Sequence, residues 1–340
     1  MYKVGVIGLG HIAAMYETPE SKNPYCHVGG ILKSSKVKLT KVADMSEEAR
    51  VKFRSVWGDC FSDLQYYDSS QKMLDSKDLD IIAVCVRGPH HFQVMMEALA
   101  ASPKAVFLEK PPSCSLAEMD EMMRMAAAKN IPITVSYSRH WNLHMLKMQE
   151  LVKKGLIGQV KTVIGYCGGT VLSFASHTTD LICQFAGYCP STVYASGEIL
   201  DQAPAGFESE PSLTHMVIHF ENGVTGIQVG ANGEHGAFYC EVFGTKGSLR
   251  VGMYTDTVVR TTNGELVDLT PYHISERESV FTTAYDQIAN HLNGGPLPDC
   301  TNDDFVTVNE IGFAAIESIY TGKVVELPNR DRTRKIFANG

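Results

Sequence analysis

The stretch GVIGLGHIA, residues 5–13, stands at the head of the chain and decides how the first half of the protein is expected to fold. It places Gly8, Gly10 and Ala13 in a G-x-G-x-x-A pattern directly behind a short apolar run. In such a pattern the first glycine permits a tight turn, the second lets a pyrophosphate approach the backbone, and a small third residue lets a helix pack close to the strand. Ordinary turns also contain such glycines, but this position in a β-α-β chain favours a dinucleotide-binding loop.

A helix is expected to open within this loop, so that His11 and Ile12 offer backbone N–H groups to the cofactor phosphates. Asp44 follows the next apolar run and is suited to accept hydrogen bonds from the adenosine ribose hydroxyls, which favours NAD over NADP. Asp44 also suits the N-cap of a helix. The separation from Gly10 exceeds the usual ~20 residues, because a polar and aromatic loop follows the glycines.

Residues 1–135 alternate short apolar runs with helical patterns. These runs are mostly apolar, so we expect them to be buried on both faces of the sheet. They are KVGVIGLG, VKLTKVAD, DIIAVCVRG, KAVFLEKPP and IPITVSYS. A helix with a capping serine and an acid three residues later is predicted over 115–130. This rhythm predicts a doubly wound parallel sheet, and we assign residues 1–122 to a nucleotide-binding domain.

After about residue 155 the runs follow one another with turns between them, which predicts a largely antiparallel sheet. They are VKTVIGYCGG, STVYASGEIL, SLTHMVIHF, GVTGIQVGAN and GAFYCEVFG. Two later helical patterns, TAYDQIANHLNG and TVNEIGFAAIESIYTG, are expected to complete this domain. The predicted fold class is therefore α/β, with an N-terminal parallel domain and a C-terminal α+β domain over residues 123–340 that has a mostly antiparallel sheet.

Composition excludes several classes of protein. The 340 residues are 44% hydrophobic and 20% charged, with a net charge of −8. These values are typical of a globular protein, and the acidic balance gives no basic footprint for nucleic acid or anionic membrane. The nine cysteines contain no C-x-x-C pair, which argues against a disulfide framework or zinc site and favours the reducing cytoplasm.

The segment VFLEKPPS, residues 106–113, ends the fifth apolar run with an acid, a lysine and two prolines. Lys110 is therefore expected at the carboxyl edge of the sheet, where open α/β folds bind ligands. A surface lysine is the ordinary alternative. The prolines favour the functional interpretation, because they fix the backbone around Lys110. A held ammonium can bind a substrate hydroxyl and help to remove its proton.

The Gly-rich loop, EKP after the fifth strand, and H-x-x-D within GGTVLSFASHTTDLICQFAG together resemble the Gfo/Idh/MocA family of NAD(P)-dependent sugar and polyol oxidoreductases. CEVFGTKGSLRV and AAIESIYTGKVVELP resemble its C-terminal domain, so the likeness extends along nearly the whole chain. The resemblance implies a Rossmann domain, a C-terminal α/β domain, bound NAD or NADP, and homodimers or homotetramers formed through the open sheet.

Position by position, the resemblance implies that Lys110 and His177 are catalytic, His177 as the general acid/base. Asp180, three residues later on the same helix face, would hold substrate; the alternatives are a helix-start histidine and a solvated acid. Arg139 and Trp141 match substrate-contacting positions, with a helix cap and a core aromatic as the alternatives.

One substrate position departs from the family. Many of its polyol dehydrogenases have an aspartate four residues before the histidine, where this chain has Ser173. Serine cannot act as an anionic partner. Either His177 works without one, or the groups of the substrate fill the space, or the chain no longer performs simple alcohol oxidation.

Further cofactor contacts are expected from the loops after the fourth and fifth strands, at Arg87, His90 and Glu109. His90 and His91 are adjacent, but no carboxylate or cysteine stands at a supporting spacing, so we predict no metal.

The predicted function is reversible, NAD-dependent hydride transfer to or from a sugar, inositol or sugar-nucleotide hydroxyl, in a cytoplasmic homo-oligomer. Two alternatives remain. One is a redox-neutral NAD-dependent elimination or glycoside hydrolysis, and the other is a non-catalytic sugar or dinucleotide sensor.

Overall fold

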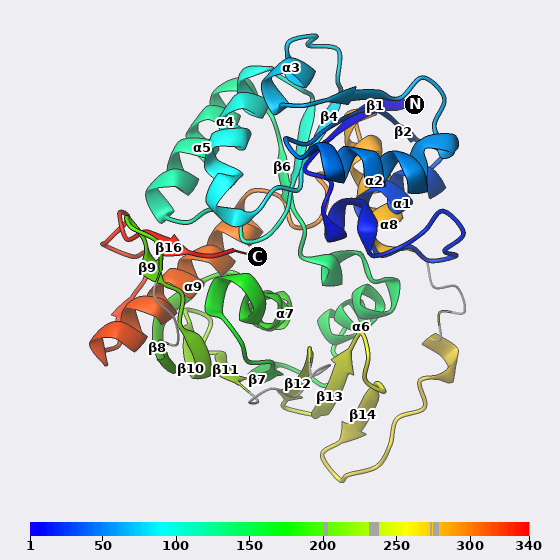
Figure 1. Ribbon diagram of the computed structural model, residues 1–340. Coiled ribbons are helices and arrows are strands. Elements are labelled where there is room, and N and C mark those ends of the chain that lie inside the picture. The colour runs from blue at the N-terminus through cyan, green and yellow to red at the C-terminus, as the bar shows by residue number, and fades with distance from the viewer. Residues whose placement is uncertain (200–202, 231–237, 273, 275–278, 340) are drawn as a thin grey trace. The chain divides into compact units, whose positions relative to one another are not determined.

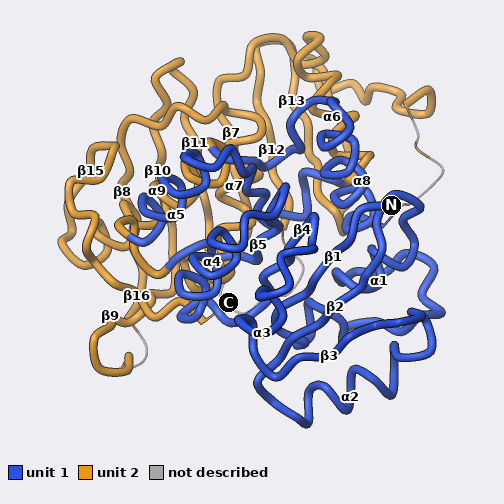
Figure 2. Tube along the Cα trace, turned by 90° about the horizontal axis from the view of Figure 1, so that it is seen from above, with its two compact units in different colours: residues 1–113, 118–141, 276–302 blue, residues 114–117, 142–275, 303–340 orange. Residues whose placement is uncertain are grey.

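The structure is a computed structural model that describes residues 1–199, 203–230, 238–272, 274 and 279–339. The chain forms two compact units, coloured separately in Figure 2. Unit 1 comprises residues 1–113, 118–141 and 276–302, and unit 2 comprises residues 114–117, 142–275 and 303–340.

Unit 1 contains a six-stranded sheet in the order β3-β2-β1-β4-β5-β6, and every pair in it is parallel. The strands are β1 (Tyr2–Ile7), β2 (Val37–Ala43), β3 (Gln65–Tyr67), β4 (Ile81–Val84), β5 (Ala105–Leu108) and β6 (Ile133–Val135). All residues of β4 and β5 are buried, as expected for strands covered on both faces. The predicted doubly wound parallel sheet is confirmed, although the short β3 was not anticipated.

Helices cover both faces of this sheet. The helices of unit 1 are α1 (His27–Lys33), α2 (Glu47–Trp57), α3 (Ser70–Leu74), α4 (His91–Ala100), most of α5 (Leu116–Lys129) and α8 (Val280–Leu292). Three short 3-10 helices accompany them: η2 (Gly58–Cys60), η3 (Gly88–His90) and η4 (Ser138–Trp141). Figure 1 shows α4 and α5 on one side of the strands and α1, α2 and α8 on the other.

Two expectations for this unit need correction. The helix after the Gly-rich loop is a single π-helical turn, η1 (His11–Met15); α1 starts only at His27, and Pro19 and Pro24 in the intervening loop do not support a continuing helix. In addition, the helix predicted to complete the second domain, α8, packs against α1 and β2 of unit 1. Its apolar face, which includes Phe281 and Ile288, is buried there.

Unit 2 contains an eight-stranded sheet in the order β14-β13-β12-β7-β11-β10-β8-β15. The strands are β7 (Val160–Tyr166), β8 (Pro190–Glu198), β10 (Ser212–Phe220), β11 (Thr225–Val229), β12 (Tyr239–Gly244), β13 (Gly247–Gly252), β14 (Val258–Thr261) and β15 (Val325–Glu326). Only β7 and β11 pair in parallel among these strands, which confirms the mostly antiparallel prediction. A separate parallel pair joins β9 (Glu208–Ser209) to β16 (Ile336–Phe337).

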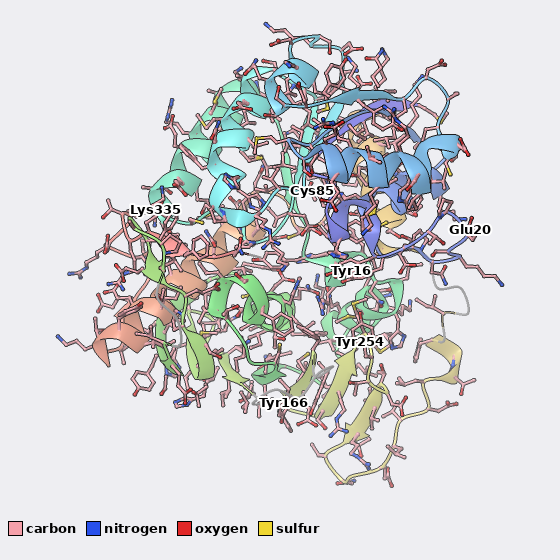
Figure 3. The ribbon with its side chains drawn as sticks, in the orientation of Figure 1. Tyr16, Glu20, Cys85, Tyr166, Tyr254 and Lys335 are labelled. Carbon is pink, nitrogen blue, oxygen red and sulfur yellow. The ribbon has the colours of Figure 1, made fainter. Side chains whose placement is uncertain are left out.

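The helices of unit 2 lie along one face of its sheet. They are α6 (Leu143–Lys153), α7 (Ser176–Ala186) and α9 (Asp303–Thr321), with the π-helical turn η5 (Val171–Ala175) before α7 and the 3-10 turn η6 (Thr270–Tyr272). Figure 1 shows α9, α7 and α6 side by side along the strands. The residues that alternate away from these helices include Tyr194 and Phe243, which are partly exposed, and Tyr166, which is labelled in Figure 3.

Most of the nine cysteines are buried. Cys85 and Cys183 lie in the core as small apolar side chains, as predicted. Among the described helices, none has the length and apolar character that crossing a membrane requires.

Candidate cofactor and active-site residues

Gly8 is required by the conformation of the chain itself. Its φ is +89°, which a residue with a side chain rarely adopts. A Cβ at this position would lie 2.7 Å from the backbone carbon and oxygen of Cys85, which directly follows β4. The glycine therefore lets the end of β1 turn tightly against the end of β4.

Gly10 is not required in this way. Its φ is −74°, and a Cβ built on it would meet no atom within 4 Å. The chain thus leaves open space beside the Gly10 backbone, as a pyrophosphate needs. Ala13 is fully buried under the same turn, and no side chain in the described structure caps the start of η1 at Gly10. His11 is exposed and Ile12 is half-buried. These features fit a dinucleotide.

Asp44 lies beside the Gly-rich loop. Its Oδ2 accepts the N–H of Leu9 at 2.8 Å, and its Oδ1 accepts the N–H of Ser46 at 2.9 Å. The N-cap of α2 is Ser46, whose hydroxyl accepts the N–H of Ala49, so Asp44 does not serve as that cap. Each carboxylate oxygen has a further lone pair with which it can accept a ribose hydroxyl.

The loop after β4 presents one exposed and one buried histidine. Arg87 and His90 are exposed. His91 is fully buried, with Nδ1 2.7 Å from the carbonyl oxygen of Pro111 and Nε2 2.8 Å from that of Val86. Burial lowers the pKa of His91, although these two carbonyls act in the opposite direction. His91 thus connects the loop after β4 to the loop after β5.

Lys110 immediately follows β5, one residue beyond Glu109, and is half-buried. The peptide bond between Lys110 and Pro111 is cis. The N–H of Lys110 donates to Oε2 of Glu109 at 3.2 Å. The prediction that Lys110 stands at the carboxyl edge of the sheet is therefore confirmed for its position.

Behind Lys110 lies a buried hydrogen-bonded chain formed by Tyr285, His27 and Glu109. His27 Nε2 is 3.0 Å from Glu109 Oε1, and Nδ1 is 2.8 Å from the Tyr285 hydroxyl. A carboxylate only accepts, so Nε2 carries a proton and, in the neutral ring, the tyrosine donates to Nδ1. The three residues come from α1, the end of β5 and α8.

The charge states in this chain follow from its surroundings. Burial by itself would raise the pKa of Glu109, but the His27 hydrogen bond and the charges of His27 and Lys110 hold it below its usual value. Burial raises the pKa of Tyr285 well above its usual value. A carboxylate and a neutral phenol therefore flank the His27 ring behind the carboxyl end of β5.

Arg139 and Trp141 lie on η4 and are almost fully buried. The indole N–H of Trp141 donates to Gln287 at 3.2 Å, and its ring meets Phe107 edge-on with centroids 5.4 Å apart. This environment is that of a core aromatic.

In unit 2, the helix predicted to open at the SHTTD segment is α7, which starts at Ser176. His177 is half-buried, with its ring edge-on to Phe238 at 5.9 Å. Asp180 is fully buried and accepts hydrogen bonds from Gln184 at 2.7 Å and Tyr188 at 3.4 Å. The alternative that made Asp180 a solvated acid is therefore wrong.

Ser173 lies on η5, four residues before His177. Its hydroxyl donates to the Glu210 carboxylate at 2.6 Å. Sequence reasoning missed both Glu210 and His27, because each meets its partner over a long sequence separation and no local pattern marks it.

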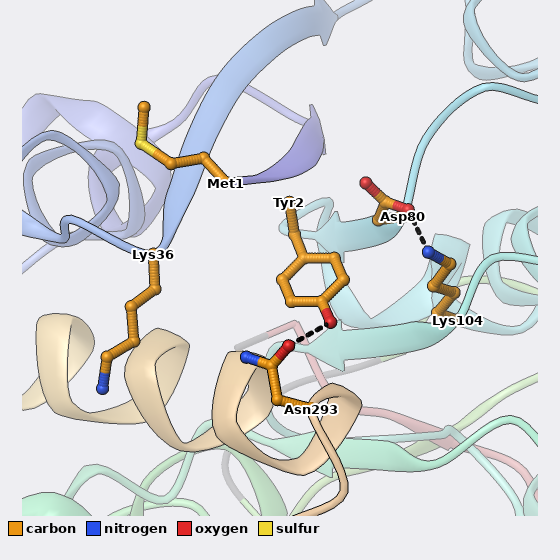
Figure 4. A pocket seen from close by; sticks show the side chains of 6 residues that line it. All are labelled: Met1, Tyr2, Lys36, Asp80, Lys104 and Asn293. Carbon is orange, nitrogen blue, oxygen red and sulfur yellow. Dashed lines mark hydrogen bonds and ion pairs between the residues drawn. The ribbon is translucent and has the colours of Figure 1, made fainter.

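A separate pocket of about 400 Å³ lies in unit 1 at the amino ends of the strands. Figure 4 shows Met1 and Lys36 with two interacting pairs: Tyr2 donates to Asn293, and Lys104 is ion-paired with Asp80. Ligands of parallel α/β sheets bind at the carboxyl ends, so this pocket belongs to the opposite edge from Gly8 and Lys110.

Comparisons with known proteins agree with this fold. Residues 2–137 match the NAD-binding Rossmann fold of the GFO_IDH_MocA oxidoreductase family, and residues 166–327 match the C-terminal alpha/beta domain of that family. A myo-inositol 2-dehydrogenase of Thermotoga maritima is 24% identical, with 96% of this chain and 98% of that protein covered.

Solved structures share the fold at lower identity. The scyllo-inositol dehydrogenase of Lactobacillus casei, with bound NAD(H) and scyllo-inositol, has a TM-score of 0.72 at 19% identity, covering 96% of this chain and 98% of that chain. The WlbA dehydrogenase of Bordetella pertussis, in complex with NADH and UDP-GlcNAcA, has a TM-score of 0.74 at 18% identity, covering 96% and 99%. Since the family models match most of the chain, the protein belongs to the Gfo/Idh/MocA family of oxidoreductases and carries its NAD-binding Rossmann domain.

Proposed function

We propose that the protein is an NAD-dependent dehydrogenase that transfers hydride between the nicotinamide and a CH–OH group of a sugar, inositol or sugar nucleotide. The observation that carries the proposal is the end of β5. There Lys110 follows a buried Glu109 carboxylate that His27 holds at 3.0 Å. The inositol-linked relatives support a polyol or sugar substrate, and the UDP-GlcNAcA complex supports a sugar nucleotide as the second option.

In the proposed reaction the alcohol loses a hydride and a proton and becomes a ketone or lactone. Bound NAD supplies the hydride acceptor. Lys110 binds the hydroxyl oxygen through its ammonium, and His177 takes up the hydroxyl proton and returns it in the reverse direction. Asp180 and Ser173 orient the other hydroxyl groups of the substrate, and Arg139 is a further candidate contact.

The cofactor residues follow the geometry of unit 1. The open space at Gly10 supports pyrophosphate binding, with His11, Ile12 and Ala13 on the adjoining turn. Asp44 would accept the ribose hydroxyls and repel a 2′-phosphate, which is why we propose NAD rather than NADP. Arg87, His90 and Glu109 stand on the loops after β4 and β5 and are proposed to contact the cofactor.

Several broader properties are also proposals. We propose that unit 1, which is built mainly from residues 1–122 and is completed by β6 and α8, holds the cofactor, and that the rest of residues 123–340 serves substrate binding and assembly. The partly apolar outer face of the eight-stranded sheet supports a homodimer or homotetramer. The many buried cysteine side chains suit a reducing cytoplasm.

The test is NADH formation by purified protein with NAD or NADP and a panel of inositols, aldoses and nucleotide sugars. The proposal expects net reduction of NAD with at least one substrate, and less with NADP. If NAD binds but no NADH forms while a product appears, the redox-neutral alternative replaces the dehydrogenase. If NAD or sugar binds and nothing reacts, the sensor replaces it.

A further inference from the structure

The chain before η5 is tied to the chain before β10. Thr170 and Ser212 form an isolated antiparallel bridge. The N–H of Val171 donates to the carbonyl of Pro211 at 3.1 Å, and the N–H of Leu213 donates to that of Gly169 at 2.8 Å. These contacts bring Glu210, which immediately precedes Pro211, to the start of the helical run that carries His177.

The Glu210 carboxylate binds this start through three donors. Its Oε1 accepts the N–H groups of Leu172 at 2.6 Å and Ser173 at 2.7 Å. Its Oε2 accepts the hydroxyl of Ser173 at 2.6 Å. These are charge-assisted hydrogen bonds, and a negative charge is favourable at the beginning of a helix. Glu210 is half-buried.

The bond to Oε2 fixes what the Ser173 hydroxyl can do. A hydroxyl has one proton and two lone pairs. Since the proton points at Glu210, Ser173 presents lone pairs to its other neighbours, and the charged partner strengthens it as an acceptor. Ser173 and His177 are four residues apart in consecutive helical segments, η5 and α7, and residues at this spacing lie on the same side of a helix.

We propose that Glu210 is a positioning residue for the reaction proposed above. Glu210, two residues before β10, supplies a negative charge next to position 173, where the sequence has a serine. It acts on His177 and on the substrate through the Ser173 hydroxyl. The inference rests on the proposed function for the role of His177. Ser173 polarised by Glu210 is an acceptor for a hydroxyl or imidazole N–H.

The test begins with Glu210→Gln. The glutamine oxygen can still accept the two backbone N–H groups, but its NH₂ group faces the Ser173 hydroxyl and turns that hydroxyl away. We expect kcat to fall about 10- to 100-fold, as part of the ~10²–10⁴-fold that acid–base catalysis contributes. KM and the melting temperature should change little. The matched control is Glu208→Gln, because Glu208 lies two residues earlier and pairs with Arg334 at the surface.

Two further variants keep the test decisive. Ser173→Ala retains the cap from Glu210 but lacks the hydroxyl, so it should lose a similar factor in kcat even if Glu210→Gln folds poorly. Adding Ser173→Asp to Glu210→Gln returns a carboxylate to the same place and should restore at least tenfold in kcat. Loss of kcat only in proportion to loss of folded protein, with no rescue, would overturn the proposal.

A readout without substrate separates this inference from the proposed function. The ring proton signals of His177, assigned by their absence in His177→Asn, should move in Glu210→Gln and stay in place in Glu208→Gln. If they move while no variant and no wild-type protein turns over any sugar or polyol, the dehydrogenase proposal fails, but the action of Glu210 on His177 stands. If they do not move, the positioning role fails whatever the activity.

Discussion

Gly8 and Gly10 stand two residues apart in one loop, but only Gly8 is needed by the chain itself. Gly8 combines a positive φ with a close approach to the Cys85 backbone. Gly10 has an ordinary φ and open space where a Cβ would be. Substituting each by alanine therefore separates the folding role of the loop from its cofactor role.

Gly8→Ala should lower the free energy of unfolding by about 1–3 kcal/mol from backbone strain, and by more where the Cβ clash is not relieved. Gly10→Ala should stay within about 0.5 kcal/mol of wild type and weaken NAD binding about tenfold or more, equivalent to ~1.4 kcal/mol. Urea unfolding and calorimetric titration with NAD measure the two effects. If Gly10→Ala bound NAD as tightly as wild type does, the proposal that the pyrophosphate binds beside Gly10 would be wrong.

Lys110 is proposed to hold the reacting hydroxyl rather than the cofactor phosphates. Lys110→Met keeps the length of the apolar stem and removes the charge. We expect kcat/KM to fall by about 10²–10⁴-fold, with the Kd for NAD changed much less. Lys72→Met is a suitable control, because Lys72 is an exposed lysine paired with Asp68. A Lys110→Met protein with normal turnover would exclude Lys110 from the chemistry.

The chain from Tyr285 through His27 to Glu109 joins three elements, α8, α1 and the end of β5. Two substitutions separate its halves. In His27→Gln the amide nitrogen can replace Nε2 and donate to Glu109, whereas in His27→Asn the amide oxygen can replace Nδ1 and accept the Tyr285 hydroxyl. A buried carboxylate that loses its partner costs about 3–5 kcal/mol, but a lost neutral hydrogen bond costs only about 1 kcal/mol. His27→Asn should therefore be the more destabilised variant near neutral pH.

The pH dependence follows from the pKa of Glu109. In wild type the pKa of Glu109 is lowered by folding, so ionised Glu109 stabilises the folded protein. This contribution to the free energy of unfolding is present above the pKa of about 4.3 that glutamate has in the unfolded chain, and it is lost as pH falls through the pKa of Glu109 in the folded protein. In His27→Asn the effect of burial is no longer opposed by His27, so the pKa of Glu109 should rise. The stability deficit should then shrink as pH is lowered from about 8 to about 5, and denaturant unfolding at several pH values measures it. If the difference in unfolding free energy between His27→Asn and wild type did not change with pH, the loss of stability would not come from a buried, ionised Glu109.

The elements were predictable where the signal is local. The apolar runs predicted β1, β2, β4, β5 and β6. The last three are buried at every position, since a strand covered on both faces needs continuous apolar sequence, whereas β2 also carries the exposed Lys38. The single turn η1 was not predictable from the glycine pattern, because the pattern specifies the turn and not the length of the helix after it. The placement of α8 depends on a tertiary surface formed by α1 and β2.

In the candidate site, too, local sequence marks some residues, whereas others are found only from the tertiary structure. The order of the Gly-rich loop, Lys110 and His177 could be found in the sequence, and each lies at the predicted element boundary. Glu210 and His27 could not be found. Their hydrogen bonds to Ser173 and Glu109 depend on strand register and on packing between distant segments, which no local spacing encodes.

For the whole molecule, the outer face of the eight-stranded sheet is the surface through which we propose that copies of the chain associate. Its register places Ile164, Ile227 and Val217 in one cross-strand row on the face away from α7, with Tyr194 at one end and the ion-paired Glu241 and Arg250 at the other. Tyr166 and Tyr239 stack on the same face, with ring centroids 4.5 Å apart. An apolar face of this kind is typical of an interface between copies.

Ile164→Glu should therefore dissociate the proposed assembly, because it would bury a second carboxylate beside Glu241 in the proposed contact. Light scattering after size exclusion should give the monomer mass of 37.3 kDa for the variant and a multiple of it for wild type. Lys161→Glu on the same strand is the control and should leave the mass unchanged. A monomeric wild type would refute assembly through this face.

The central claim is that hydride passes between a CH–OH carbon of the substrate and NAD on this protein. The most direct measurement uses a panel of inositols, aldoses and nucleotide sugars that carry deuterium on their carbon atoms, with mass analysis of the cofactor. We expect one deuterium in the reduced cofactor with wild-type protein, and almost none with Lys110→Met. A cofactor that remains unlabelled and oxidised across the whole panel, while it demonstrably binds, would contradict the account.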